Sequence, residues 1–170
     1  MTPITKSLFL IAGLVLAGCT SPSQFGSDGN GNTVDLNNPP VTTDPLGDPA
    51  STSYFSNAIG DRVLFAVDES TLGAEARQIL QGQATWLNTN RDYAIVVEGH
   101  ADEQGTREYN LALSAKRASA VQQFLVQNGV SGSRIRTVPY GKERPIEICS
   151  EETCYTKNRR AVTLLQAGIS

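Results

Sequence analysis

The sequence is poor in the residues from which most catalytic and metal centres are built. It contains one histidine, three cysteines and one tryptophan among 170 residues. A hydrolytic zinc site usually needs at least two nitrogen or sulfur ligands beside a carboxylate, so a single histidine, His100, argues against such a site. No GxSxG nucleophile elbow occurs either. The sequence therefore predicts no catalytic residues, no metal and no cofactor.

An excess of positive charge is also lacking. Lysine and arginine total 14 against 17 aspartates and glutamates, which gives a formal net charge of -3 and a pI of about 5.1. Nucleic acids and anionic surfaces attract basic proteins. Nucleic acid is therefore not an expected partner, and any contact with a membrane is expected to come from lipid.

Long apolar runs are scarce. The run at residues 8–16 follows Lys6 and is too short to span a bilayer as a helix, so residues 1–18 are interpreted as an export signal. The run ends in Leu-Ala-Gly-Cys19, which resembles the lipobox of bacterial lipoproteins and implies acylation of Cys19. Several acyl chains would anchor the chain stably in a membrane. The alternative is an ordinary cleaved signal with Cys19 as a free thiol.

With Cys19 assigned to lipid, two cysteines remain, Cys149 and Cys154. In an exported domain a short-loop disulfide is the default interpretation. A zinc pair and a redox site are the alternatives, but no second CxxC-like pair is present and the spacing exceeds that of thioredoxin-like sites.

The composition divides the chain into a linker and one domain. Residues 19–55 are rich in Gly, Asn, Asp, Ser, Thr and Pro, and such a segment cannot bury enough apolar surface to order itself. We therefore expect a lipidated Cys19 and a flexible linker over residues 19–55, followed by a domain over residues 56–170.

Apolar periodicity indicates an α/β fold for this domain. Apolar residues at helical spacing predict a helix over residues 72–87, and a second helix is expected to begin after Thr106 and end near Asn128-Gly129. Strands are predicted at 62–67, 92–99, 135–140 and 161–166. Alternating strands and helices imply βαβ units and a sheet with helices packed against it.

The most informative feature is the run 97–121, in which a strand ends in an acidic turn and a helix follows at once. Arg117 lies one helical turn from both Leu113 and Val121, so it faces the core. A buried guanidinium calls for a compensating anion. Asp102 is the nearest candidate.

Several spaced motifs run through the expected domain in a fixed order. They are Gly99-His100-Ala101-Asp102, Asn110, Leu113-Ser114, Arg117-Ala118, Val121, Leu125, Tyr140-Gly141-Lys142 and Asn158-Arg159-Arg160. Together they resemble the OmpA-like peptidoglycan-binding domain family, over about residues 61–166. The resemblance implies a βαβαββ domain, a two-layer α+β sandwich with helices packed on a mixed four-stranded sheet.

The resemblance also implies a ligand and a site. In the family an aspartate and an arginine bind the ammonium and the carboxylate of meso-diaminopimelate, and by motif these residues are Asp102 and Arg117. One anion and one planar donor fork suit a zwitterion. The alternative is an internal salt bridge between the two residues.

Two further residues are candidates for this site. Asp68 falls where family members place a pocket-lining residue, or it caps a strand-end turn. Arg159 is a second candidate carboxylate contact, or part of a solvated basic face. The most similar members of the family usually carry an aromatic residue immediately before the position of Asp68, where this chain has Val67. Apolar cover beside the ligand is therefore not predicted.

Within the family, this chain most resembles the lipoproteins of the Tol-Pal envelope system. The resemblance lies in the lipobox, the linker and the sequences around Tyr140 and Tyr155. This implies an outer-membrane, periplasm-facing protein of a Gram-negative bacterium that links membrane to cell wall, with TolB as a partner and roles in envelope integrity and cell division. An OmpA-like lipoprotein without a Tol partner is the nearest rival. A wall hydrolase using Glu98, His100 and Asp102 is the rival from another class, although His100 is expected to be a hydrogen-bonded residue that shapes the turn.

Overall fold

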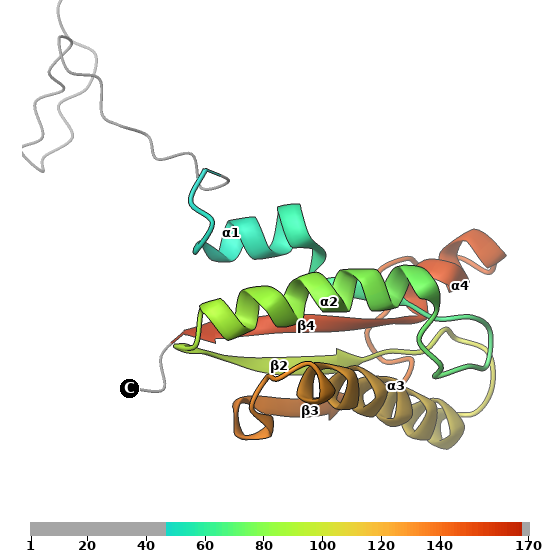
Figure 1. The fold of residues 1–170 in the computed structure, drawn as a ribbon. Coiled ribbons are helices and arrows are strands. Elements are labelled where there is room, and N and C mark those ends of the chain that lie inside the picture. The colour runs from blue at the N-terminus through green and yellow to red at the C-terminus, as the bar shows by residue number, and fades with distance from the viewer. Residues whose placement is uncertain (1–46, 168–170) are drawn as a thin grey trace, which may run out of the picture. The chain divides into compact units, whose positions relative to one another are not determined.

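The computed structural model describes residues 47–167 (Figure 1). The expected export signal, Cys19 and the linker up to residue 46 lie outside the described residues. The elements follow in the order α1 (Thr52–Tyr54), the π-helical turn η1 (Phe55–Gly60), β1 (Arg62–Leu64), α2 (Ala74–Thr89), β2 (Tyr93–Gly99), α3 (Arg107–Gln127), the 3-10 turn η2 (Gly132–Arg134), β3 (Ile135–Pro139), α4 (Glu152–Asn158) and β4 (Arg160–Ala167).

The four strands form one mixed sheet in the order β1-β4-β2-β3. β2 and β3 are parallel, and β4 is antiparallel to both β1 and β2. The helices α2 and α3 lie on the same side of this sheet (Figure 1). The predicted α/β fold with a mixed four-stranded sheet is confirmed.

The core lies between the sheet and these two helices. Alternate residues of a strand point to the same face, so Ile95 and Val97 of β2 both face the helices. They meet Leu87 of α2 and Val121 and Leu125 of α3 in one cluster of buried side chains. Burial of these residues holds α3, and with it Arg117, against the end of β2.

The folded part begins before the expected boundary at residue 56. Phe55 is completely buried, and its ring centroid lies 4.9 Å from that of Trp86 on α2. The indole Nε1 of Trp86 donates a hydrogen bond to the Pro49 carbonyl, at 2.6 Å. The end of the expected linker therefore packs on the domain, because its aromatic residues can bury apolar surface that the polar residues before them cannot.

The turn and the helix at the end of β2 form as predicted. The Thr106 hydroxyl accepts a hydrogen bond from the Tyr109 amide at 3.2 Å and caps α3. Gly129, just after the helix, has a φ of 93°, which suits glycine at a helix end. At Gly99 the strand comes so close to α3 that an added Cβ would lie 2.0 Å from the Ser114 carbonyl oxygen.

A short helix that the sequence did not predict, α4, lies between β3 and β4. A disulfide joins Cys149 to Cys154, the expected pairing, with 6.0 Å between the Cα atoms. The bridge ties the segment before α4 to Cys154 within the helix. In residues 47–167 no helix combines the length and apolar character needed to cross a membrane.

Candidate functional site

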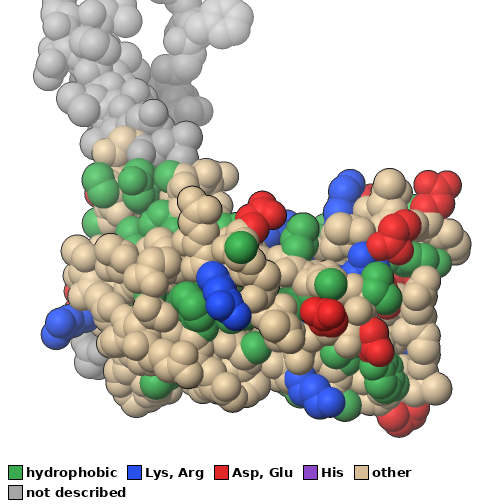
Figure 2. Space-filling view, turned by 45° about the vertical axis from the view of Figure 1, so that its right-hand side comes forward, with side chains coloured by type: hydrophobic (Ala, Val, Ile, Leu, Met, Phe, Trp, Pro, Cys, Tyr) green, Lys and Arg blue, Asp and Glu red, His purple; other side chains and the backbone are tan. Residues whose placement is uncertain are grey.

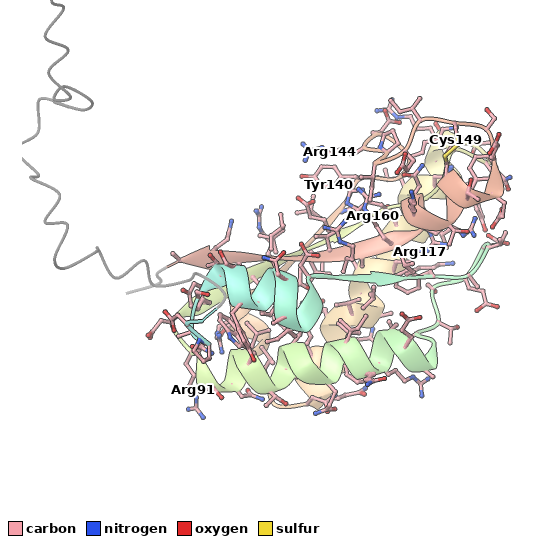
Figure 3. The ribbon with its side chains drawn as sticks, turned by 90° about the horizontal axis from the view of Figure 1, so that it is seen from above. Arg91, Arg117, Tyr140, Arg144, Cys149 and Arg160 are labelled. Carbon is pink, nitrogen blue, oxygen red and sulfur yellow. A yellow bond between two sulfur atoms is a disulfide. The ribbon has the colours of Figure 1, made fainter. Side chains whose placement is uncertain are left out.

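Arg117 lies on α3 at the end of the domain that also carries α4 (Figure 3). Its side chain is completely buried, as its spacing from Leu113 and Val121 predicts. Burial lowers the pKa of the guanidinium to about 10, and the charge of Asp102 acts in the opposite direction. The side chain therefore stays protonated at neutral pH and carries a charge into the interior.

The anion expected beside Arg117 is not in direct contact with it. Three backbone carbonyls accept its hydrogen bonds: that of Glu69 from Nε at 2.8 Å, that of His100 from Nη1 at 2.9 Å, and that of Ala66 from Nη2 at 3.1 Å. The guanidinium also lies over the Phe65 ring, 5.2 Å from its centroid. The expectation failed because these carbonyls come from segments remote in sequence, and helical spacing does not reveal them.

Asp102 pairs with Arg159 instead, so the internal Asp102–Arg117 bridge considered from the sequence is absent. The Oδ2 atom of Asp102 lies 3.1 Å from Nη1 of Arg159, and both side chains are buried. The Oδ1 atom accepts a hydrogen bond from the Gln104 amide at 3.3 Å, which shapes the turn before α3. Asp102 still lies close enough to Arg117 to influence its pKa.

Arg159 joins the same cluster and does not belong to a solvated basic face, since it is 4% exposed. Besides Asp102 it contacts the Glu152 carboxylate and the Thr156 hydroxyl, the latter at 2.9 Å. Its Nε donates to the Phe65 carbonyl at 3.3 Å. Burial acts to lower the pKa of the guanidinium, but the hydrogen bonds to Glu152 and Asp102 outweigh it and the pKa is raised.

Asp68 lies in the segment between β1 and α2 that covers Arg117. It is exposed, and its φ of 58° is in the left-handed region, which aspartate tolerates better than most residues. The Tyr109 hydroxyl donates a hydrogen bond to its carboxylate. This contact ties the covering segment to the first turn of α3. The neighbouring Val67 is 53% exposed, so it provides little apolar cover here.

His100 is buried, and its hydrogen bonds at the strand end are made by its backbone: the amide donates to the Arg160 carbonyl at 2.9 Å, and the carbonyl accepts from Arg117. Neither ring nitrogen has a hydrogen-bond partner, and Nε2 lies 3.6 Å from the Glu98 carboxylate. The ring stacks on Tyr140 with 5.4 Å between centroids. Burial, aided by the charges of Arg160 and Arg144, lowers the pKa of the imidazole to about 4.

This environment does not suit a hydrolytic base. His100 is 2% exposed, and Figure 3 places Tyr140, Arg144 and Arg160 together on the side of the sheet away from α2. Asp102, the third residue of the hydrolase hypothesis, is engaged with Arg159. Between residues 47 and 167 no group of three or more His, Cys, Asp or Glu side chains is placed to hold a metal.

Sequence reasoning missed three residues of the site, Glu152, Thr156 and Tyr109. The first two lie on the unpredicted helix α4, and Tyr109 lies on the exposed side of α3. The spacing of Glu152 and Arg159 was a signal of their contact. The two residues are seven positions apart, and residues at i and i+7 lie on one face of a helix.

The site lies at an acidic end of the domain. Figure 2 shows most of the acidic side chains visible on that face on its right-hand part. The cluster itself, one aspartate and two arginines, is buried. The cluster brings together one carboxylate and two planar guanidinium groups.

Comparison with known proteins identifies the family of this chain. The family model described as OmpA family matches residues 64–159. A peptidoglycan-associated lipoprotein of Mesorhizobium japonicum is 49% identical over 159 residues, which cover 94% of this chain and 90% of the relative. The protein of that name from Haemophilus influenzae is 36% identical over 170 residues, with 95% and 98% covered.

Solved structures show the same fold. The crystal structure of the peptidoglycan-associated lipoprotein from Burkholderia pseudomallei is 35% identical, with a TM-score of 0.63, and covers 72% of this chain and 100% of that one. The C-terminal domain of Helicobacter pylori MotB is 21% identical, with a TM-score of 0.60 and coverage of 64% and 86%, and shares the fold alone. The chain belongs to the OmpA family and, within it, to the peptidoglycan-associated lipoproteins.

Proposed function

We propose that this chain is an outer-membrane lipoprotein that binds peptidoglycan non-covalently and has no enzymatic activity. Its domain would face the periplasm, with acylated Cys19 in the membrane. The observation that carries the proposal is the buried cluster of Asp102, Arg117 and Arg159 at the end of β2. Relatives named peptidoglycan-associated lipoproteins support the same ligand.

The finer proposal is that the site binds meso-diaminopimelate of a stem peptide. Asp102 would attract the ammonium and Arg117 the carboxylate, with Asp68 and Arg159 as further contacts. Arg117 has five N–H donors, of which three bond to carbonyls. Because Arg117 is completely buried, residues 66–69 have to move aside before a carboxylate can reach it.

The test is a pull-down of the protein with purified sacculi. Arg117→Ala would leave three carbonyls without a partner and so confuse binding with stability. Arg117→Lys keeps the charge but lacks the planar fork, so we expect binding to fall at least about tenfold. Lys116→Ala, which removes an exposed cation from the same helix, is the matched control. Equal binding by Arg117→Lys and the wild type would refute the assignment.

Asp102→Asn provides a second, independent test. The amide can still accept the hydrogen bond from Arg159, but it no longer carries the charge that attracts an ammonium. We expect a loss of about 1.5–3 kcal/mol in binding free energy, the value of a hydrogen bond to a charged group.

The same sacculi also test the alternative function, a wall hydrolase that uses His100. Release of soluble fragments from the sacculi, abolished by His100→Ala, would favour the hydrolase over the binding protein.

We further propose that the protein belongs to the Tol-Pal system and binds TolB and other components of that system in support of envelope integrity and cell division. Co-purification of TolB from detergent extracts separates this role from that of an OmpA-like lipoprotein without a Tol partner. Membrane release after Cys19→Ser tests the anchor. Retention of that variant in the outer membrane would contradict it.

A further inference from the structure

Two carboxylates of very different exposure hold Arg159. Nη1 lies 3.1 Å from Oδ2 of Asp102, whose side chain is 9% exposed, while Nη2 contacts Glu152, whose side chain is 64% exposed. One side of the guanidinium is thus closed by protein and the other borders solvent. A carboxylate that arrives from solvent would meet Arg159 at the place that Glu152 occupies.

The local structure positions Glu152 there. It is the first residue of α4 and lies inside the loop closed by Cys149 and Cys154. The Thr156 hydroxyl lies 3.2 Å from the Glu152 carboxylate and 2.9 Å from Nη2 of Arg159, so it contacts both partners. The hydrogen bond from Arg159 lowers the pKa of Glu152, which is therefore ionised at neutral pH.

We propose that Glu152 competes with a carboxylate of the stem peptide for Arg159. When peptidoglycan binds, the stem-peptide carboxylate displaces Glu152 from the guanidinium. The inference rests on the proposed function and names a residue that sets the affinity of that same site. The exchange replaces one charge-assisted bond to Arg159 with another of the same kind. Its net gain is consequently small, and removing Glu152 strengthens binding.

Glu152 would have the opposite effect if it held the ligand's ammonium. Its observed partner is a cation, Arg159, and not an acceptor-lined pocket. Because Asp102 is also engaged with Arg159, the two carboxylates already neutralise one guanidinium between them. The structure thus favours competition, and the sign of the effect on affinity separates the two roles.

The experiment is a calorimetric titration of the mature chain, in detergent micelles, with the stem tripeptide Ala-Glu-diaminopimelate. We expect Glu152→Ala to bind about twofold to fivefold more tightly than the wild type, the range that release of one exposed ion pair allows. Glu151→Ala removes the neighbouring carboxylate, which forms no side-chain cap on α4, and should bind as the wild type does. With a tripeptide whose diaminopimelate carboxylates are amidated, the gain should disappear.

A direct readout is the carboxyl resonance of Glu152 in the wild type. Its pKa should rise towards the usual value when the tripeptide saturates the protein, because Arg159 is then occupied. Weaker or unchanged binding by Glu152→Ala, or a Glu152 pKa that does not move, would refute the competition while leaving the proposed function intact. No tripeptide binding by the wild type would refute both.

Discussion

At Gly99 the backbone of β2 lies close to that of α3, and Gly99→Ala tests this geometry directly. The added Cβ would lie 2.0 Å from the Ser114 carbonyl oxygen, 2.8 Å from its carbon and 3.2 Å from Ala118 Cβ. Real Cβ atoms essentially never come closer than 3.0 Å, so β2 and α3 must separate by at least 3.0 − 2.0 = 1.0 Å.

The obstacle is helix backbone, which cannot rotate away as a flexible side chain can. Overpacking typically costs about 1–3 kcal/mol, and a contact with backbone belongs at the upper end of that range. Separation also lengthens the hydrogen bond from Arg117 to the His100 carbonyl. We expect a loss of about 3 kcal/mol in unfolding free energy and a melting temperature lower by about 10 °C or more.

Urea unfolding monitored by Trp86 fluorescence, with the disulfide intact, measures this loss. Gly132→Ala is the control, because the nearest heavy atom to its added Cβ is 3.8 Å away and its φ is not positive. That variant should match the wild type or gain up to about 1 kcal/mol from reduced freedom of the unfolded chain. Equal unfolding midpoints for Gly99→Ala and the wild type would show that β2 and α3 are not in this close contact.

Three further predictions concern stability. Phe55→Ala should lose about 3–5 kcal/mol of unfolding free energy in urea, as for a buried aromatic residue, and a loss under 1 kcal/mol would place Phe55 outside the core. His100 has a folded-state pKa of about 4 against 6.5 in the unfolded chain, so its stabilising contribution is complete above pH 6.5 and is lost as the pH falls to 4, by on the order of 3 kcal/mol. Urea midpoints at pH 7 and 4.5 should therefore differ less for His100→Phe than for the wild type, and an equal difference would contradict the buried neutral ring. Alkylation of Cys149 and Cys154 should require reduction, which should lower stability by about 2 kcal/mol for so short a loop; labelling without reductant would refute the bridge.

The sequence predicts the secondary structure of the domain well where the pattern is long. The period of α3 is clear enough to place Arg117 in the core, and the Thr106 cap and Gly129 stop mark its ends. Short elements have no such period: α1 and α4 comprise three and seven residues and were not predicted. Phe55, the aromatic residue that begins η1, was placed outside the domain because the segment before it is polar.

The partners in the site were harder to predict than its members. Asp102, Arg117 and Arg159 were all identified, but the sequence suggested that the first two would pair. Which carboxylate meets which guanidinium depends on how β4 and α4 return to the end of β2, a contact across 57 residues of sequence. Carbonyl acceptors such as that of Ala66 belong to the backbone, so residue type does not reveal them.

The attachment of Pro49 to Trp86 determines how force would pass through the domain. This contact and the tilted ring contact between Trp86 and Tyr93 lie where β2 begins, whereas Asp102 follows the strand's other end. If the membrane pulls on the first point and the cell wall holds the second, tension runs along the strand axis. The hydrogen bonds of β2 to β3 and β4 are then loaded together in shear, and the sheet is not unzipped one bond at a time.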